Sequence, residues 1–214
     1  MSAAEPLPLV AVYADESCLG NGQEGDNPGA AGGVIEYRAA GSSSVTRRDF
    51  WVAEPATTNN RMALRTVIET FRILAQKNGR FRVLFTSDSQ YLIRGMSEWV
   101  AGWIGRGWRR KGGPIENLAL WQEAVERVRP HQVQWQWVRG HVGHVQNEYA
   151  NHLATRAARD QTSSAGAVPS GFDGWLAAER AAGRMHDAPA AFPDPHRFKP
   201  SKPLPAAAQP TLLD

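Results

Sequence analysis

Three strand-like segments come before the first helix of this chain, and no other feature restricts its fold as strongly. Residues 7–14, 30–37 and 45–52 read as strands separated by Gly and Ser. The stretch 20–29 between the first two is rich in Gly, Asn and acidic residues, which is typical of an exposed loop. The chain therefore opens with three consecutive strands.

Helical and strand patterns alternate in the rest of the first 160 residues. Capping side chains at 57–60 are followed by apolar residues at 63, 67, 71 and 74, the spacing of one helix face, and this helix ends near 78–79. A strand at 81–85 leads into the cap formers Thr86, Ser87, Asp88 and Ser89. The remaining pattern predicts helices at 91–96, 97–104, 116–128 and 144–159 and a half-buried strand at 132–138.

Composition excludes several classes of protein. With 214 residues, 42% of them hydrophobic, the chain can bury a core without staples. No apolar run approaches the roughly 18 residues of a membrane span, and residues 1–8 lack the pattern of a signal peptide. The single cysteine, Cys18, excludes an internal disulfide framework and a zinc site built on several thiolates. We expect a soluble, cytoplasmic monomer.

The chain divides near residue 160. Residues 161–214 hold eight of the 14 prolines and five basic and five acidic side chains, so the net charge of +3 resides in residues 1–160. We expect one domain at 1–160 that binds a polyanion. We expect the C-terminal extension, residues 161–214, to be largely flexible, with one short helix at 173–182.

Two aspartates carry the first chemical signal. Asp15 ends the first strand and Asp88 ends the fourth, so the two side chains can meet at one edge of a sheet. Paired carboxylates can hold two divalent cations about 4 Å apart, which would clamp the attacking and leaving oxygens of a phosphoryl displacement. The alternative is that each aspartate merely caps a turn or a helix.

Several sequence blocks together favour the metal site. They are DESCLGN at 15–21, TTNNRM at 57–62, TSDSQY at 86–91 and WVRGHVGH at 137–144, followed by Asn147 and Glu148. In order and spacing, from about residue 10 to 159, the chain resembles ribonuclease H of type 1.

The resemblance implies a fold and an activity. The fold would be α/β, with a mixed five-stranded sheet of three antiparallel and then parallel strands, flanked by helices. The activity would be endonucleolytic hydrolysis of the RNA strand of RNA/DNA hybrids with Mg²⁺, or Mn²⁺ as a substitute. Asp15, Asp88 and Asn151 would be metal ligands, and His141 would move protons or help the product leave. Alternatively, His141 is a plain surface histidine.

Two positions depart from the family pattern. Ala63 stands where the family has glutamate, and Asn151 where it has aspartate, so two of the usual four carboxylates remain. We expect weaker binding of a second cation, because two negative charges must hold two dications. Glu16, Glu24 or Asp26 could compensate, although alternation along a strand turns Glu16 to the face opposite Asp15. A catalytically impaired binder of RNA/DNA hybrid or duplex RNA is the alternative function.

Binding of the hybrid has its own candidate residues. Basic side chains at a glycine-rich connection can neutralise phosphates, Trp99 and Trp103 lie four apart on a helix, and the polar residues of a helix N-terminus can receive a DNA phosphate. By the resemblance, Asn21 and Gln90 would contact the minor groove and its 2′-hydroxyls. The full set is Asn21, Thr58, Asn59, Asn60, Gln90, Trp99, Trp103, Arg106, Arg109, Arg110 and Lys111. The alternatives are capping for the polar residues and burial for the tryptophans, which we favour for Trp121, Trp135 and Trp137.

The last six residues carry a separate signal. Gln209, Leu212 and Leu213 loosely resemble a peptide that binds the sliding clamp of bacterial replication. A third interpretation is therefore an adaptor that this tail recruits to the replication machinery.

Overall fold

The computed structural model describes residues 6–20, 27–39, 41–140 and 142–206. Its sheet has the strand order β5-β4-β1-β2-β3-β6. β1 (Leu9–Cys18), β2 (Gly29–Tyr37) and β3 (Thr46–Glu54) form an antiparallel meander, and β4 (Arg82–Ser87) and β5 (Gln132–Trp137) run parallel to β1. These are the five predicted strands. The sixth, β6 (Val168–Pro169), pairs with β3 and comes from the C-terminal extension.

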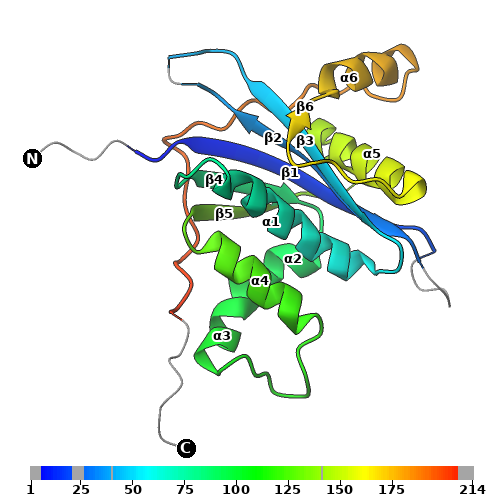
Figure 1. Ribbon diagram of the computed structural model, residues 1–214. Helices are drawn as coiled ribbons and strands as arrows, with labels where there is room; N and C mark the ends of the chain where they lie inside the picture. Colours follow the sequence, from blue (N-terminus) through cyan, green and yellow to red (C-terminus); the bar gives the residue numbers. More distant parts are fainter. Residues whose placement is uncertain (1–5, 21–26, 40, 141, 207–214) are drawn as a thin grey trace, which may run out of the picture.

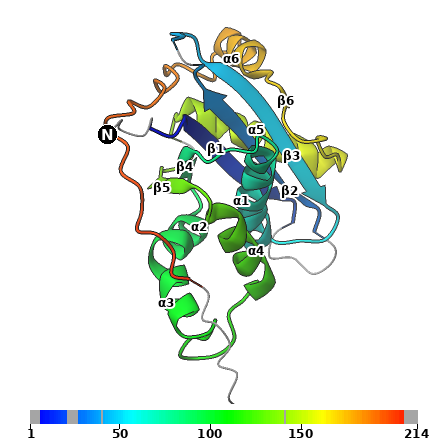
Figure 2. The same ribbon diagram turned by 60° about the vertical axis from the view of Figure 1, so that its left-hand side comes forward.

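Alternation along β1 divides the molecule into two cores, one on each face of the sheet. Val10, Val12 and Ala14 pack with α1 (Asn59–Ala75) and α4 (Leu118–Val128). Ala11 and Tyr13 pack on the other face with α5 (Val145–Asp160) and α6 (Phe172–Ala181). Figures 1 and 2 show these helices covering opposite faces of the sheet. The helices predicted at these places are present, with ends that shift by a few residues.

Between β4 and α4 the chain forms one interrupted helical run. It consists of α2 (Gln90–Arg94), a π-helical turn η1 (Gly95–Trp99) and α3 (Val100–Gly105). π-helical turns commonly occur at functional sites. Trp121 is fully buried beside this run, as predicted, and Trp135 is partly buried. The prediction for Trp137 was wrong: its side chain is 45% exposed, because it ends the sheet-edge strand β5.

The described part of the C-terminal extension contacts the domain, and the short helix predicted at 173–182 is present as α6. The buried carboxylate of Asp49 accepts hydrogen bonds from the hydroxyls of Tyr149 and Ser170 (2.5 and 2.6 Å) and from the main-chain N–H of Gly171 (2.9 Å). These bonds fix the start of α6, and the flexibility expected for the rest of the extension stays a prediction. Among the described residues, no helix is long and apolar enough to cross a membrane.

Candidate active site

The sheet topology brings Asp15 and Asp88 together. Parallel pairing of β1 with β4 ends at Tyr13 and Thr86, and each aspartate lies two residues beyond its member of that pair. Both side chains therefore lie at the carboxyl-terminal edge of two neighbouring strands. The negative charge of Asp88 also raises the pKa of Asp15, as expected for two carboxylates in contact range.

Asp15 is held in a buried, polar environment. Its side chain is 4% exposed, and its Oδ1 accepts a hydrogen bond of 2.7 Å from the main-chain N–H of Glu16. Its Oδ2 accepts one of 3.3 Å from Asn147 Nδ2. Burial is the main cause that raises the pKa of Asp15 to about 7, and Asp88 is the second. A nearby cation would favour the charged form of a carboxyl group that resists ionisation in this way.

Glu16 joins the two aspartates. Its Oε2 is buried and has no hydrogen-bond partner among the described residues. Burial first, and then the charges of Asp15 and Asp88, raise the pKa of Glu16 well above its usual value. β1 continues to Cys18, whereas β4 stops at Ser87. Glu16 therefore lies beyond the part of β1 that pairs with β4, where β4 no longer runs alongside it. Asp15, Glu16 and Asp88 are called the carboxylate cluster below.

Glu16 and Ala63 belong to the same side of the sheet. Alternation puts Glu16 on the α1 face of β1, the face of Val10, Val12 and Ala14. Ala63 is fully buried on α1 and packs in that same core. The predicted orientation of Glu16, opposite to Asp15, therefore agrees with the alternation of β1, and on that side of the sheet α1 carries the methyl group of Ala63.

Helix α5 borders the cluster on the other face. The Asn151 side chain forms a hydrogen bond that lowers the pKa of Asp15, and the charge of Glu148 raises it. The hydroxyl of Thr155 donates to Asn151 Oδ1 at 3.5 Å. Asn147 is buried, and its Oδ1 has no partner among the described residues. Amide and carboxylate oxygens thus reach the cluster from a helix as well as from two strands.

Residues 138–140 and 142–144, called the 138–144 loop below, border the site beyond β5. A Cβ at Gly140 would collide with Asp88 Oδ2 and displace it, so the glycine lets this backbone lie against the carboxylate in its present position. Trp137 Nε1 donates to the main-chain oxygen of Asp88 at 3.0 Å. His141 belongs to this loop, but its own placement lies outside the described residues.

The carboxylate cluster has the oxygen ligands that a divalent cation requires, but these ligands are not yet arranged around one point. Hard cations take oxygen ligands, and two of these carboxylates are destabilised in their charged form by burial and by each other. Within the described residues, however, no three His, Cys, Asp or Glu side chains are arranged to hold a metal ion as they stand. A cation would have to draw the carboxylate oxygens inward, and the unpartnered Glu16 Oε2 is available for this.

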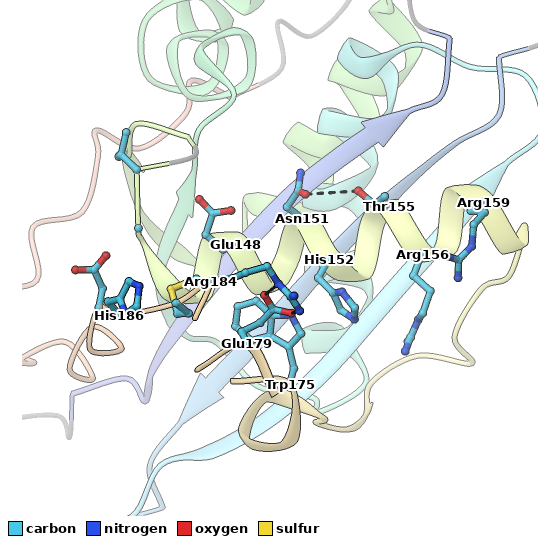
Figure 3. Close-up of a pocket in the computed structure, with 14 residues that line it drawn as sticks. Glu148, Asn151, His152, Thr155, Arg156, Arg159, Trp175, Glu179, Arg184 and His186 are labelled. Atoms are coloured by element: carbon cyan, nitrogen blue, oxygen red, sulfur yellow. Dashed lines mark hydrogen bonds and ion pairs between the residues drawn. The ribbon is translucent and has the colours of Figure 1, made fainter. Parts of the chain in front are cut away.

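A cavity of about 700 Å³ lies beside the cluster, between α5 and the C-terminal extension. Figure 3 shows Glu148 and Asn151 on α5 at one end, Arg156 and Arg159 further along this helix, and Trp175 approaching from α6. Nothing in the sequence indicated this cavity, because its outer wall is built by the extension, which carries no periodic pattern apart from one short helix.

The residues predicted to receive a phosphate lie at the N-terminus of α1. Thr58 is the N-cap residue and accepts a hydrogen bond of 3.3 Å from the main-chain N–H of Arg61. Asn59 and Asn60 form the first turn, which contains no acidic residue. The Oδ1 atom of Asn59 is buried without a partner among the described residues. Capping and anion binding are compatible here, since the remaining free N–H groups point along the helix axis.

The basic residues gather on the protrusion that follows α3. Arg106, Arg109, Arg110 and Lys111 are all exposed. Arg106 and Arg110 line a cavity of about 450 Å³ together with Trp99. Trp103 is only 8% exposed and packs edge-on against Trp121, so the structure assigns most of its ring to the core and not to the surface.

The remaining predicted residues lie at the start of α2 or outside the described residues. Gln90 is exposed at the first position of α2, directly after the strand edge that carries Asp88. Asn21, Glu24 and Asp26 lie outside the described residues, as do Gln209, Leu212 and Leu213.

Similar sequences share one family. The RNase H family model matches residues 8–159. Ribonuclease H of Stutzerimonas stutzeri is 40% identical over 148 residues, which make up 69% of this chain and 89% of that protein. Ribonuclease H of Cupriavidus necator is also 40% identical over 148 residues, 69% of this chain and 93% of that protein.

Solved structures extend the similarity to the whole chain. LC9-RNase H1, described as a type 1 RNase H with the type 2 active-site motif, is 60% identical, with a TM-score of 0.88, and the match covers 98% of this chain and 100% of that one. The RNase H domain of PFV shares the fold at 17% identity, with a TM-score of 0.59 over 74% of this chain and 99% of that domain.

Proposed function

The chain belongs to the ribonuclease H family, and on that premise we propose that it hydrolyses the RNA strand of RNA/DNA hybrids with Mg²⁺ or Mn²⁺ at the carboxylate cluster. The observation that carries this proposal is the position of Glu16. Its buried carboxylate senses the charges of Asp15 and Asp88, and with cations bound it would supply the negative charge that is missing at Ala63. The departure at Ala63 is thereby offset within the chain.

Each residue of the site has a distinct role in this proposal. Asp15, Glu16 and Asp88 would hold the cations, and Asn151 would add a neutral oxygen ligand. Bound cations would supply an activated water and neutralise charge that develops on the phosphate. Asn147 fixes the orientation of Asp15 through its hydrogen bond to Oδ2. His141 would exchange protons with the reacting phosphate or the leaving product.

The family relationship also supports the substrate. LC9-RNase H1 is described as having the type 2 active-site motif, which fits a chain whose acidic set differs from the usual type 1 pattern. Thr58, Asn59 and Asn60 would receive a phosphate of the DNA strand, and the exposed basic protrusion would bind further phosphates. Asn21 and Gln90 would identify the RNA strand by its 2′-hydroxyls. Trp99 would offer a stacking surface for a sugar or base.

Glu16→Gln provides the decisive test. The variant keeps the size of the side chain but removes its negative charge, so we expect kcat with Mg²⁺ to fall roughly 100-fold or more. The assay is cleavage of an end-labelled RNA/DNA hybrid, with RNA/RNA and DNA/DNA duplexes as substrate controls and with 3′-hydroxyl and 5′-phosphate ends as the expected products.

Glu126→Gln, on the exposed face of α4, is the matched control and should retain the wild-type kcat. Equal kcat for Glu16→Gln and the wild type would contradict the proposal. If the wild type binds the hybrid but never cleaves it, the chain is a hybrid-binding protein in which the metal site has decayed.

We further propose that the enzyme acts as a cytoplasmic monomer and that Gln209, Leu212 and Leu213 bind a sliding clamp. Deletion of residues 209–214 should abolish clamp binding in a pull-down and leave hybrid cleavage unchanged. Unchanged clamp binding would refute the role of the tail.

Light scattering of the purified chain should give the mass of one copy, 23.5 kDa.

A further inference from the structure

The C-terminal extension reaches the loop that borders the active site. Residues 187, 188 and 190 follow α6 and line a common cavity with residues 138, 139 and 142–145. The family model ends at residue 159, so these contacts are additional to the family domain. Figure 3 shows the neighbouring residues Arg184 and His186 beside α5, close to Glu148.

One contact fixes the beginning of α5. Gln146 is 0% exposed, and its side chain forms two hydrogen bonds with the main chain of Ala190. Its Nε2 donates to the Ala190 oxygen at 2.8 Å, and its Oε1 accepts from the Ala190 N–H at 3.0 Å. Gln146 is the second residue of α5, two and five positions before Glu148 and Asn151. Both polar atoms of the amide group thus attach the extension to the helix that carries the site.

A second contact supports the loop itself. A Cβ at Gly143, whose φ is +90°, would collide with the carboxylate of Asp187, so the loop backbone lies directly against that side chain. At its other end, Gly140 lies against Asp88 Oδ2. The loop is therefore held between a carboxylate of the extension and a carboxylate of the active site.

We propose that residues 185–190 are a positioning element for catalysis: they press the 138–144 loop toward Asp88 and fix the start of α5. Gln146 and Asp187 are the positioning residues. The inference rests on the proposed function, since the geometry that it maintains is that of the hydrolytic site. Preorganised placement of catalytic groups affects kcat more than substrate binding, because small displacements of reacting groups slow the chemical step.

Gln146→Ala tests this role, and Gln134→Ala is its matched control. Gln134 also holds the extension through its side chain, because its Oε1 accepts a 2.8 Å hydrogen bond from the Lys199 N–H, but it lies on β5. For Gln146→Ala we expect hydrogen exchange of the amides at 138–144 to become roughly tenfold faster. We also expect kcat on the hybrid to fall about fivefold to tenfold with KM unchanged. Gln134→Ala should change neither quantity.

Asp187 provides a second test that folding defects cannot obscure, because this residue is exposed. Asp187→Ala should accelerate loop exchange and lower kcat in the same direction, whereas the isosteric Asp187→Asn should retain wild-type values. Wild-type exchange and kcat in both Gln146→Ala and Asp187→Ala would overturn the inference, as would equal effects of Gln134→Ala. If the wild type cleaves no hybrid, the proposed function fails, and the exchange measurements still decide whether the extension holds the loop.

Discussion

At the scale of single residues, alternation along β1 distributes the acids of the site. By alternation, Asp15 continues the side of β1 that packs on α5, and its neighbour Glu16 continues the side that packs on α1, which carries Ala63. The sequence motifs identified Asp15, Asp88 and Asn151 as candidates because each follows a recognisable pattern. They did not place Glu16, since its location depends on where β4 ends relative to β1, which only strand pairing determines.

Substitution at position 63 tests this distribution of charge. Ala63→Glu should lower the free energy of unfolding by about 2 kcal/mol or more without cations, because it buries another carboxylate beside two that already resist ionisation. In the Glu16→Ala background, the same substitution should instead raise kcat at least roughly tenfold, since the charge returns from the helix. Urea denaturation and hybrid cleavage provide the two measurements. If Ala63→Glu raised activity more in the wild type than in the Glu16→Ala background, a glutamate at position 63 would not be taking over the role of Glu16.

At the scale of elements, local periodicity was sufficient for the five long strands and the main helices. The sixth strand, Val168–Pro169, could not be predicted, because two residues form no pattern and pair only when the extension reaches the edge of β3. The π-helical turn was also missed, since a π turn and an α turn share nearly the same apolar spacing. Tertiary contacts, rather than propensity, determine both features.

His131, at the entry to β5, is expected to make stability depend on pH. Its ring lies beside Phe71 and Phe81, with centroid distances of 5.1 and 5.8 Å, and its Nδ1 accepts a hydrogen bond of 3.2 Å from the Phe81 N–H. Burial, and then the charge of Arg80, lower the pKa of His131. The unfolded chain therefore takes up the proton first, and stability present above the ordinary pKa of about 6.5 is lost as the pH falls below it.

The raised pKa values of Asp15 and Glu16 act in the opposite sense and stabilise the fold as the pH falls, so the role of His131 is read from the difference between variants. Between pH 8 and pH 5, the urea midpoint of His131→Gln, which keeps an acceptor but cannot be protonated in this range, should fall less or rise more than that of the wild type. The exposed His196 offers a control, because His196→Gln should follow the wild type. Equal changes of the urea midpoint in the wild type and His131→Gln would refute the role of His131.

At the scale of the whole molecule, the C-terminal extension spans the sheet from one edge to the other. β6 pairs with β3, and further along the Ser201 N–H donates to the Val133 oxygen of β5 at 2.8 Å. Both edge strands are thereby covered, which protects them from pairing with other chains. Figures 1 and 2 show the extension passing from α6 along the molecule to the side of β5.

Asp49 anchors this arrangement. Asp49→Ala would leave the hydroxyl of Tyr149 and the N–H of Gly171 without their buried acceptor. We expect the free energy of unfolding to fall by about 3 kcal/mol. Asp173→Ala is the control and should change it by less than about 0.5 kcal/mol, because the Asp173 side chain is 89% exposed although it pairs with Arg47. If both substitutions lowered the free energy of unfolding equally in urea denaturation, the buried hydrogen bonds of Asp49 would stabilise the fold no more than the exposed ion pair of Asp173.

Anomalous diffraction from crystals of the full chain soaked in Mn²⁺ tests the central claim most directly. The account predicts a manganese peak within bonding distance of carboxylate oxygens of Asp15, Glu16 and Asp88, and a weaker peak or none in Glu16→Gln. A peak bound without any oxygen of Glu16, equally strong in the wild type and in Glu16→Gln, would contradict it.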